Sequence, residues 1–333
     1  MTSQGTTPTV PPAIGHHRST GRAAALPPVV ACAGGLRVAL RGAMPPAHLD
    51  PVAVVRVGPV APVVLPDAQP VEARRSDGVV WRRHWPEPDR LVVEFTDLAV
   101  VEVREDPGLV VFDRALPADT EQHLLLDHVL PLILARRRHL VLHGGVISWG
   151  RRGAVLVGSP GAGKSTLTAY AWQHGWTVGG DDGAVLHATD PPEVEPTYAT
   201  IRLTASGAGL LGIDVAEGSG VVGKTRIAGH GARAFRQERV DLRVVAVVEP
   251  VGADVAAGFV GLGGIDAHAE LFGSTFHADL SGRGGRLPTV VYDLATVIEA
   301  TVVGRLLVPR GAAGLAGAER LLRRLVVAEA PPC

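Results

Sequence analysis

Residues 158–167 read "GSPGAGKSTL", and residues 158–165 match the phosphate-binding pattern G-x-x-x-x-G-K-[S/T] in full. Glycines let backbone N–H groups turn inward and approach phosphate oxygens closely. A helix that begins near Lys164 directs its positive end at the phosphates. Lys164 would then reach the β- and γ-phosphates, and the Ser165 hydroxyl could coordinate Mg²⁺. We expect the nucleotide to be bound by Gly158, Ser159, Pro160, Gly161, Ala162, Gly163, Lys164, Ser165 and Thr166.

The segments around this loop have the order of an α/β nucleotide-binding domain. The apolar run "GAVLVG", 153–158, predicts a strand before the loop, and "KSTLTAYAWQHG", 164–175, predicts a helix closed by Gly175. The next apolar run, "TVGGDD", 177–182, predicts another strand. Strand, loop, helix and strand in this order favour an α/β fold.

Two adjacent carboxylates, Asp181 and Asp182, stand at the end of the strand that follows the loop. A single Asp after such a strand is often a Mg²⁺ ligand. If the strand ends there, both side chains could turn into the site, one for the metal and one to accept a proton from a hydroxyl nucleophile. The sequence does not decide which Asp has which role. The alternative is that "GGDDGA" simply forms a turn, because its residues also suit one.

His143 lies in "LVLHGG", 140–145, shortly before the strand that leads to the loop. We expect "HLVLHGGVISW", 139–149, to form one strand that pairs with the loop's strand in a hairpin, which would bring His143 near the phosphates. A histidine satisfied within a strand is the alternative, and the spacing leaves the two open.

The rest of the chain divides into three predicted parts. Residues 1–28, which include His16 and His17, are rich in Thr, Pro, Gly and Ser and predict a disordered leader. Residues 29–118 carry short apolar runs broken by Pro, Gly and Asp, which predict a small β-rich domain. Residues 119–330 would form the P-loop domain. They open with an expected helix over 119–138 that Pro131 could kink, and they close with another over 315–328.

Further strands are expected at "YATIRL", 198–203, and "RVVAVVEP", 243–250. The very glycine-rich segment over 205–231 between them predicts a mobile loop that could close over an acceptor as a lid. This segment contains Lys224, one of only two lysines among the 32 basic residues. Because the other lysine is Lys164, the chain keeps lysine for positions where a compact charge on a flexible stem is useful.

Composition excludes several classes of function. A net charge of −1 argues against a nucleic-acid protein with a basic face, and the chain lacks an apolar run long enough to span a membrane. Two cysteines, Cys32 and Cys333, give neither a disulfide framework nor a zinc site. The stretch 22–35 faintly resembles an export signal but starts late and is interrupted by two prolines, so we expect a cytoplasmic protein.

The motifs "LHGGVI", "GSPGAGKSTL" and "GGDD" together resemble the HPr kinase/phosphorylase family, which is structurally akin to PEP carboxykinases. The nearer likeness is to the HPr-kinase-like proteins of ribosomal-peptide biosynthetic clusters, including the lasso-peptide tail kinases. "TIRL" with Arg202 and "LLVPRG" with Pro309 and Arg310 extend that likeness. The second signature of true HPr kinases is missing after Arg202, which counts against phosphorylase activity and against HPr as the acceptor.

The resemblance implies a P-loop kinase core that uses ATP and Mg²⁺. It implies that Lys164 and Ser165 bind the triphosphate and the metal, that His143 lines the site, and that the aspartates supply a general base and a metal ligand, with Asp182 as the expected metal ligand beside Ser165. Three basic residues are candidate phosphate or acceptor contacts: Arg202, Lys224 and Arg226.

The sequence therefore predicts a kinase that transfers the γ-phosphoryl group of ATP to a hydroxyl acceptor. The acceptor could be Ser or Thr of a peptide or protein, or a biosynthetic small molecule, and no nucleic-acid or membrane partner is expected. Whether the chain forms a homo-oligomer stays open. The alternative is a nucleotide-binding regulator or pseudokinase that performs no transfer.

Overall fold

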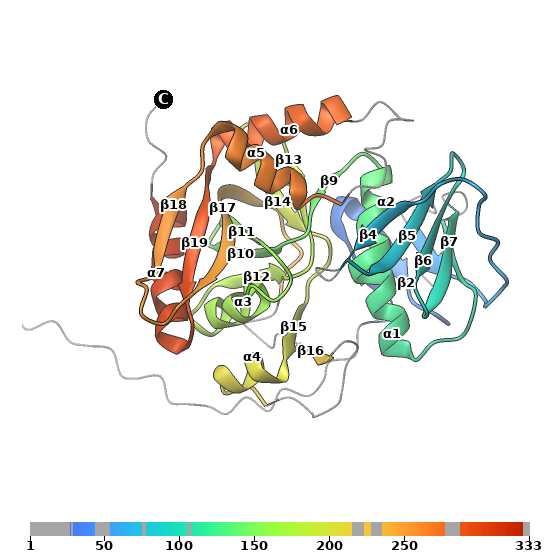
Figure 1. Cartoon of the computed structure of the whole chain (residues 1–333), viewed down its shortest axis with the longest axis horizontal. Coiled ribbons are helices and arrows are strands. Elements are labelled where there is room, and N and C mark those ends of the chain that lie inside the picture. Colours follow the sequence, from blue (N-terminus) through green and yellow to red (C-terminus); the bar gives the residue numbers. More distant parts are fainter. Residues whose placement is uncertain are drawn as a thin grey trace, which may run out of the picture.

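The computed structural model describes residues 27, 29–43, 54–74, 78–104, 108–214, 223–227, 235–276 and 287–328 of the 333-residue chain. They form a mixed α/β structure with two large sheets and a two-stranded ribbon. Figure 1 shows the first sheet on the right and the second on the left. The leader predicted over 1–28, with His16 and His17, lies outside the described residues except for Pro27.

The first sheet contains the N-terminal strands in the order β1-β2-β3-β8-β7-β6-β5-β4. Strands β4 to β8 are antiparallel neighbours, whereas β3 runs parallel to both β2 and β8. Their content of valine and other β-branched or aromatic residues suits a pleated, half-buried surface, and the predicted β-rich character of this part is confirmed. The bounds are β1 Val29–Ala31, β2 Arg37–Ala39, β3 Val54–Val57, β4 Val71–Arg74, β5 Val80–Pro86, β6 Arg90–Phe95, β7 Ala99–Arg104 and β8 Leu109–Phe112, with a 3₁₀ turn η1 Ala33–Gly35 after β1.

The segment predicted as a helix over 119–138 is helical, but its hydrogen bonding changes midway. It consists of α1 (Ala118–His123), a π-helical turn η3 (Leu124–Val129) and α2 (Leu130–Arg136). In the π turn the Leu130 N–H donates to the Leu125 carbonyl, five residues back. Pro131 follows immediately and has no N–H to offer the carbonyl four residues before it. The wider turn therefore ends where the proline interrupts the regular α-helical pattern.

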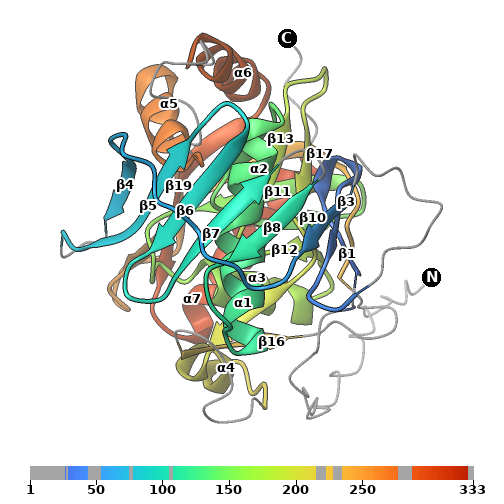
Figure 2. The same cartoon turned by 90° about the vertical axis from the view of Figure 1, so that its right-hand side faces the viewer.

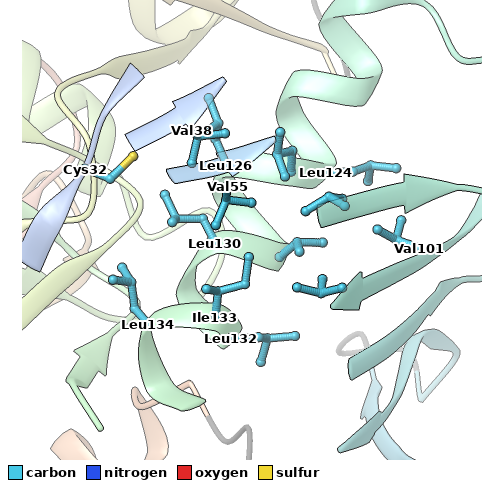
Figure 3. Close-up of a cluster of buried hydrophobic side chains, with 14 of the residues drawn as sticks. Cys32, Val38, Val55, Val101, Leu124, Leu126, Leu130, Leu132, Ile133 and Leu134 are labelled. Carbon is cyan, nitrogen blue, oxygen red and sulfur yellow. The ribbon is translucent and has the colours of Figure 1, made fainter. Parts of the chain in front are cut away.

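This helical segment covers one face of the first sheet, as Figure 2 shows. Leucines at helical spacing, Leu126, Leu130 and Leu134, are fully buried, and Figure 3 shows them gathered with Val38 and Val55 of the sheet. Burying one leucine side chain contributes about 1.5–3 kcal/mol. The apolar stripe of the helix is therefore what holds it on the sheet.

The second sheet has nine strands, with the path β12-β10-β11-β17-β14-β13-β9 and with β19 and β18 continuing from β17. Strands β11, β17 and β19 are parallel neighbours, so their carboxyl ends lie at one edge. The bounds are β9 Leu140–Leu142, β10 Gly145–Trp149, β11 Arg152–Val157, β12 Thr177–Gly180, β13 Ala184–His187, β14 Glu193–Pro196, β17 Val240–Val251, β18 Gly258–Gly261 and β19 Val302–Pro309.

Helices pack on both faces of this sheet. Ala154 and Leu156 of β11 share a core with α3 and α7, whereas Val155 and Val157 share a core with α5 and α6. This alternation follows from the two-residue period of a strand. The C-terminal helix predicted over 315–328 is confirmed as part of α7. The bounds are α3 Lys164–Gln173, α5 Gly264–Gly273, α6 Leu287–Ala300 and α7 Ala312–Val327.

The prediction of a single strand over 139–149 is wrong, because the strand is interrupted at His143 and Gly144. Its first half, β9, pairs with β13, and its second half, β10, pairs with β11 and β12. A Cβ atom at Gly144 would lie 2.8 Å from the Leu156 carbonyl oxygen, so the bend requires glycine there. The hairpin of β10 with β11 is present as predicted.

The glycine-rich segment over 205–231 is only partly a loop. Residues 205–210 form the short helix α4 (Ala205–Leu210), capped by the Thr204 hydroxyl, which accepts from the Gly207 N–H at 3.1 Å. Strands β15 (Ile201–Thr204) and β16 (Lys224–Ile227) pair as an antiparallel ribbon. Residues 215–222 and 228–234 lie outside the described part, so the lid stays a prediction.

The boundary predicted at residue 118 also stays a prediction. The helical segment that follows it shares its core with the first sheet, and Val141, Val185 and Tyr198 from beyond it join the same core. Each described helix falls short of the length or the apolar character that a transmembrane span requires.

Candidate active site

The predicted phosphate-binding loop connects β11 to α3 in the expected order of strand, loop and helix. Gly158, Gly161 and Gly163 have φ angles of 136°, 83° and 95°, a region that favours glycine. The Cβ position of Gly158 lies 2.8 Å from the Val248 carbonyl oxygen, so this glycine also permits close packing on β17. The loop's glycines therefore stand where the backbone requires them.

Lys164 and Ser165 form the first turn of α3, next to the loop. The Lys164 ammonium group donates to the carbonyl oxygens of Gly158 at 2.7 Å and of Ser159 at 3.3 Å, and the residue is only 7% exposed. Burial lowers the pKa of Lys164, while the charges of Asp182 and Asp181 oppose that shift. The structure thus holds the lysine over the loop and in electrostatic contact with both aspartates.

The two aspartates follow the last residue of β12, Gly180, as expected. Asp181 is 1% exposed, and its Oδ2 accepts a hydrogen bond from the Arg202 backbone N–H at 3.0 Å. The Ser165 side chain lies close enough to this carboxyl group to lower its pKa. The predicted metal ligand of the loop therefore lies beside the first of the two carboxylates.

Burial raises the pKa of both carboxyl groups, and the neighbouring Asp181 raises that of Asp182 further. Two buried carboxylate oxygens, Oδ1 of Asp181 and Oδ2 of Asp182, have no hydrogen-bond partner among the described residues. Mg²⁺ takes one or two carboxylates together with phosphate oxygens and water, rather than a cage made only of protein side chains. Orphaned carboxylate oxygens beside the Ser165 hydroxyl fit this ligand set. Within the described ranges, three or more His, Cys, Asp and Glu side chains do not come together as a metal cluster.

His143 lies beside the aspartates, because the bend after β9 brings it to the start of the hairpin. Its backbone N–H donates to the Ser274 carbonyl at 2.7 Å, its ring makes an edge contact with Phe276, and the nearby Asp182 backbone acts to raise the pKa of the ring. Burial, with the charges of Lys164 and Lys224, lowers the pKa of His143 to about 4. The imidazole is therefore neutral at pH 7 and adds no charge to the site.

The three predicted basic contacts lie on the β15–β16 ribbon. In its strand register, Arg202 stands opposite Arg226, and Thr204 stands opposite Lys224. Only Lys224 acts on the whole site: its charge lowers the pKa of Asp181, Asp182 and His143. Arg226 donates to the Gln122 side chain at 3.3 Å. The Arg202 guanidinium, 4% exposed, is directed to the helical segment on the first sheet and not to the loop.

Sequence reasoning missed the partners of Arg202. Asp127, in the π turn, accepts from the Arg202 guanidinium at 2.6 Å and from the Tyr198 hydroxyl, and its Oδ2 lies 2.5 Å from His123 Nδ1. Burial alone would raise the pKa of Asp127, but the hydrogen bond with His123 and the charges of His123 and Arg202 hold it below its usual range. The signal was present in "HLLLDH", where charged residues interrupt a leucine-rich helix at a spacing of four.

Neither a family model nor a curated protein matches the chain. Among solved structures it is similar to the HPr(Ser) kinase/phosphatase from Coxiella burnetii, with 12% identity over 55% of this chain and 88% of that chain, at a TM-score of 0.30. A likeness this distant assigns no family, so the function is inferred from the chain's own residues.

Proposed function

We propose that the protein is an ATP- and Mg²⁺-dependent kinase that transfers the γ-phosphoryl group to a hydroxyl acceptor. The observation that carries the proposal is the proximity of the phosphate-binding loop to two buried carboxylates, whose charges act on Lys164 and which each have one oxygen without a hydrogen-bond partner among the described residues. A protein that only binds nucleotide needs one acidic residue for the metal. A second buried carboxylate in the same place suits proton transfer from a nucleophile.

The loop residues have distinct roles in this proposal. Backbone N–H groups of residues 158–165 and the amino end of α3 bind the triphosphate, and Lys164 neutralises charge on the β- and γ-phosphates. Mg²⁺ held at this site would supply positive charge that offsets the negative charge of the phosphates. The Ser165 hydroxyl of the loop would be one protein ligand of the Mg²⁺ ion. A carboxylate at the end of β12 would be the other.

The sequence alone did not decide which aspartate binds the metal and which acts as the general base. The environments of the two aspartates favour one assignment. Asp181 accepts a hydrogen bond from the Arg202 N–H and has its pKa lowered by the nearby Ser165 side chain, which suits the metal side of the site. Asp182, which we expected as the metal ligand beside Ser165, has no hydrogen-bond partner for Oδ2 among the described residues, and its backbone lies near His143. We therefore assign the metal to Asp181 and the removal of the acceptor's hydroxyl proton to Asp182.

The acceptor and the family belong to this proposal as well. The likeness of "LHGGVI", "GSPGAGKSTL" and "GGDD" to HPr-kinase-like proteins supports an HPr-kinase-like core over residues 119–330 and favours Ser or Thr of a peptide or protein as the acceptor. A hydroxylated biosynthetic small molecule fits the same chemistry. The competing proposal is a nucleotide-binding regulator, and transfer itself separates the two.

The test is mass spectrometry of candidate acceptors incubated with the protein, ATP and Mg²⁺. The candidates are peptides and hydroxylated metabolites encoded or made by neighbouring genes. We expect one acceptor to gain the mass of one phosphoryl group, and the gain to disappear with Asp182→Asn and with Asp181→Asn. ATP binding without transfer to any candidate would favour the regulator.

A further inference from the structure

A groove of about 400 Å³ lies between α7, the end of β19 and the chain that follows β17. It is separate from the candidate active site, because none of the loop or aspartate residues lines it. Half of its lining residues are small: Ala253, Ala256, Ala257, Ala313, Gly314 and Gly317. Three arginines also line it, Arg310 just after β19 and Arg320 and Arg324 on α7, together with Val255, Pro309 and Leu321.

The three arginines differ from their neighbours in having no acidic partner. Other arginines of the same two elements are paired: Arg305 of β19 with Glu270 and Arg323 of α7 with Glu319, each at 2.8 Å. The guanidinium groups of Arg310, Arg320 and Arg324 are exposed and make no hydrogen bond or ion pair within the described ranges. Among the described residues, the groove's lining contains no Asp or Glu.

This arrangement is unfavourable for the protein alone. Arg320 and Arg324 stand one helical turn apart, and like charges at this spacing destabilise a helix by about 0.2–0.5 kcal/mol. Opposite charge placed between the arginines would relieve their repulsion. Unpaired arginines in a groove lined by alanine and glycine suggest an anionic ligand that comes from outside the described residues.

We propose that this groove binds an acidic segment of a polypeptide in an extended conformation. The twelve helical steps of α7 from Ala312 to Arg324 span about 18 Å at 1.5 Å per residue, which is the length of about five to six extended residues. Alternate carboxylates of such a segment would face the arginines, while the alanines leave room for its backbone. A nucleic acid fits less well, because no Trp, Tyr or Phe lines the groove to stack on a base.

The groove lies at the same sheet edge as the phosphate-binding loop. The loop follows β11, whereas Arg310 follows β19, and the parallel neighbours β11, β17 and β19 end at this edge. Strands β11 and β19 are about 10 Å apart across the sheet. A polypeptide held in the groove would therefore approach the loop's side of the molecule, although binding itself does not depend on the proposed transfer.

The experiment measures fluorescence anisotropy of a labelled hexaglutamate peptide titrated with the whole protein at low salt. We expect saturable binding that weakens as salt is added, and a loss of at least tenfold in affinity for Arg320→Glu/Arg324→Glu. The matched control is Arg151→Glu/Arg236→Glu, which changes the net charge equally at two exposed arginines elsewhere and should bind like the unchanged protein.

Labelled hexaglutamine and hexalysine peptides and a short single-stranded DNA are the competing probes. Hexaglutamate that binds no better than hexaglutamine, or equally well to both double variants, would overturn the proposal. Tighter binding of the DNA that is lost only in the groove variant would overturn the choice of a polypeptide. Thermal melting of each variant verifies that it is folded.

Discussion

The backbone N–H of Arg202 donates to Asp181 Oδ2 at 3.0 Å, while the guanidinium of the same residue donates to Asp127 Oδ2 at 2.6 Å. Arg202 therefore joins a carboxylate of the candidate active site to a buried polar network on the helix that covers the first sheet. The position of Asp181 depends on strand β15, and β15 is anchored through Arg202 to the π turn. Asp127 thus acts as a positioning residue without contact with the phosphate-binding loop.

Asp127→Ala should destabilise the protein by about 3–5 kcal/mol, because it removes the buried carboxylate that pairs with the buried Arg202 guanidinium. Urea unfolding at pH 7 measures this loss. Tyr198→Phe is the control, since it removes one hydrogen bond to the same carboxylate and should cost about 1 kcal/mol. Similar small losses for both variants would contradict the role given to the Arg202–Asp127 pair.

Gly163→Ala should reduce both stability and nucleotide binding. Gly163 has φ 95° and its Cβ position is open, so the cost is backbone strain of about 1–2 kcal/mol rather than a clash. Gly150 in the turn between β10 and β11 has φ 62° and is equally open, which makes Gly150→Ala a matched control. We expect similar losses in unfolding free energy but weaker ATP binding only for Gly163→Ala; equal ATP affinities would argue against the loop as the phosphate site.

The free energy of unfolding should fall as the pH is lowered below about 6.5. Burial and the charge of His123 lower the pKa of His128 well below 6.5, with Asp127 opposing and Arg82 adding to the shift. The unfolded chain binds a proton that the folded chain excludes, so acid favours unfolding. His128→Phe, which keeps a ring against Trp81 and Phe95, should flatten the pH dependence measured by urea unfolding from pH 7 to 5. An unchanged slope would show that His128 does not titrate as inferred.

Cys32 should not react with a thiol reagent in the folded protein at pH 8. It is 1% exposed in the core between the helix and the first sheet, and burial raises its pKa to about 12. In a Cys333→Ser background, Ellman's reagent should detect one thiol in guanidinium and none under native conditions. Fast native labelling would contradict the burial of Cys32.

The sequence was sufficient where a short pattern determines backbone geometry. The glycines of "GSPGAGKST" require a turn with positive φ, so the loop, its strand and helix, and the aspartates at the end of β12 were predictable. The bend at Gly144 was not, because it depends on the Leu156 carbonyl of another strand. Arg202 was expected near phosphate but pairs with Asp127, since the packing of a helix across the first sheet decides which buried charge it meets. Such long-range contacts produce no local pattern in the sequence from which they could be predicted.

The most direct test of the central claim is isothermal titration of the protein with ATP, with and without Mg²⁺. We predict Mg²⁺-dependent binding that weakens by about tenfold or more in Lys164→Ala, since hydrogen bonds with charged groups contribute about 1.5–3 kcal/mol. The exposed variant Arg151→Ala should bind ATP like the unchanged protein. ATP binding that is absent, or equal in Lys164→Ala, would contradict the assignment of residues 158–165 as the triphosphate site.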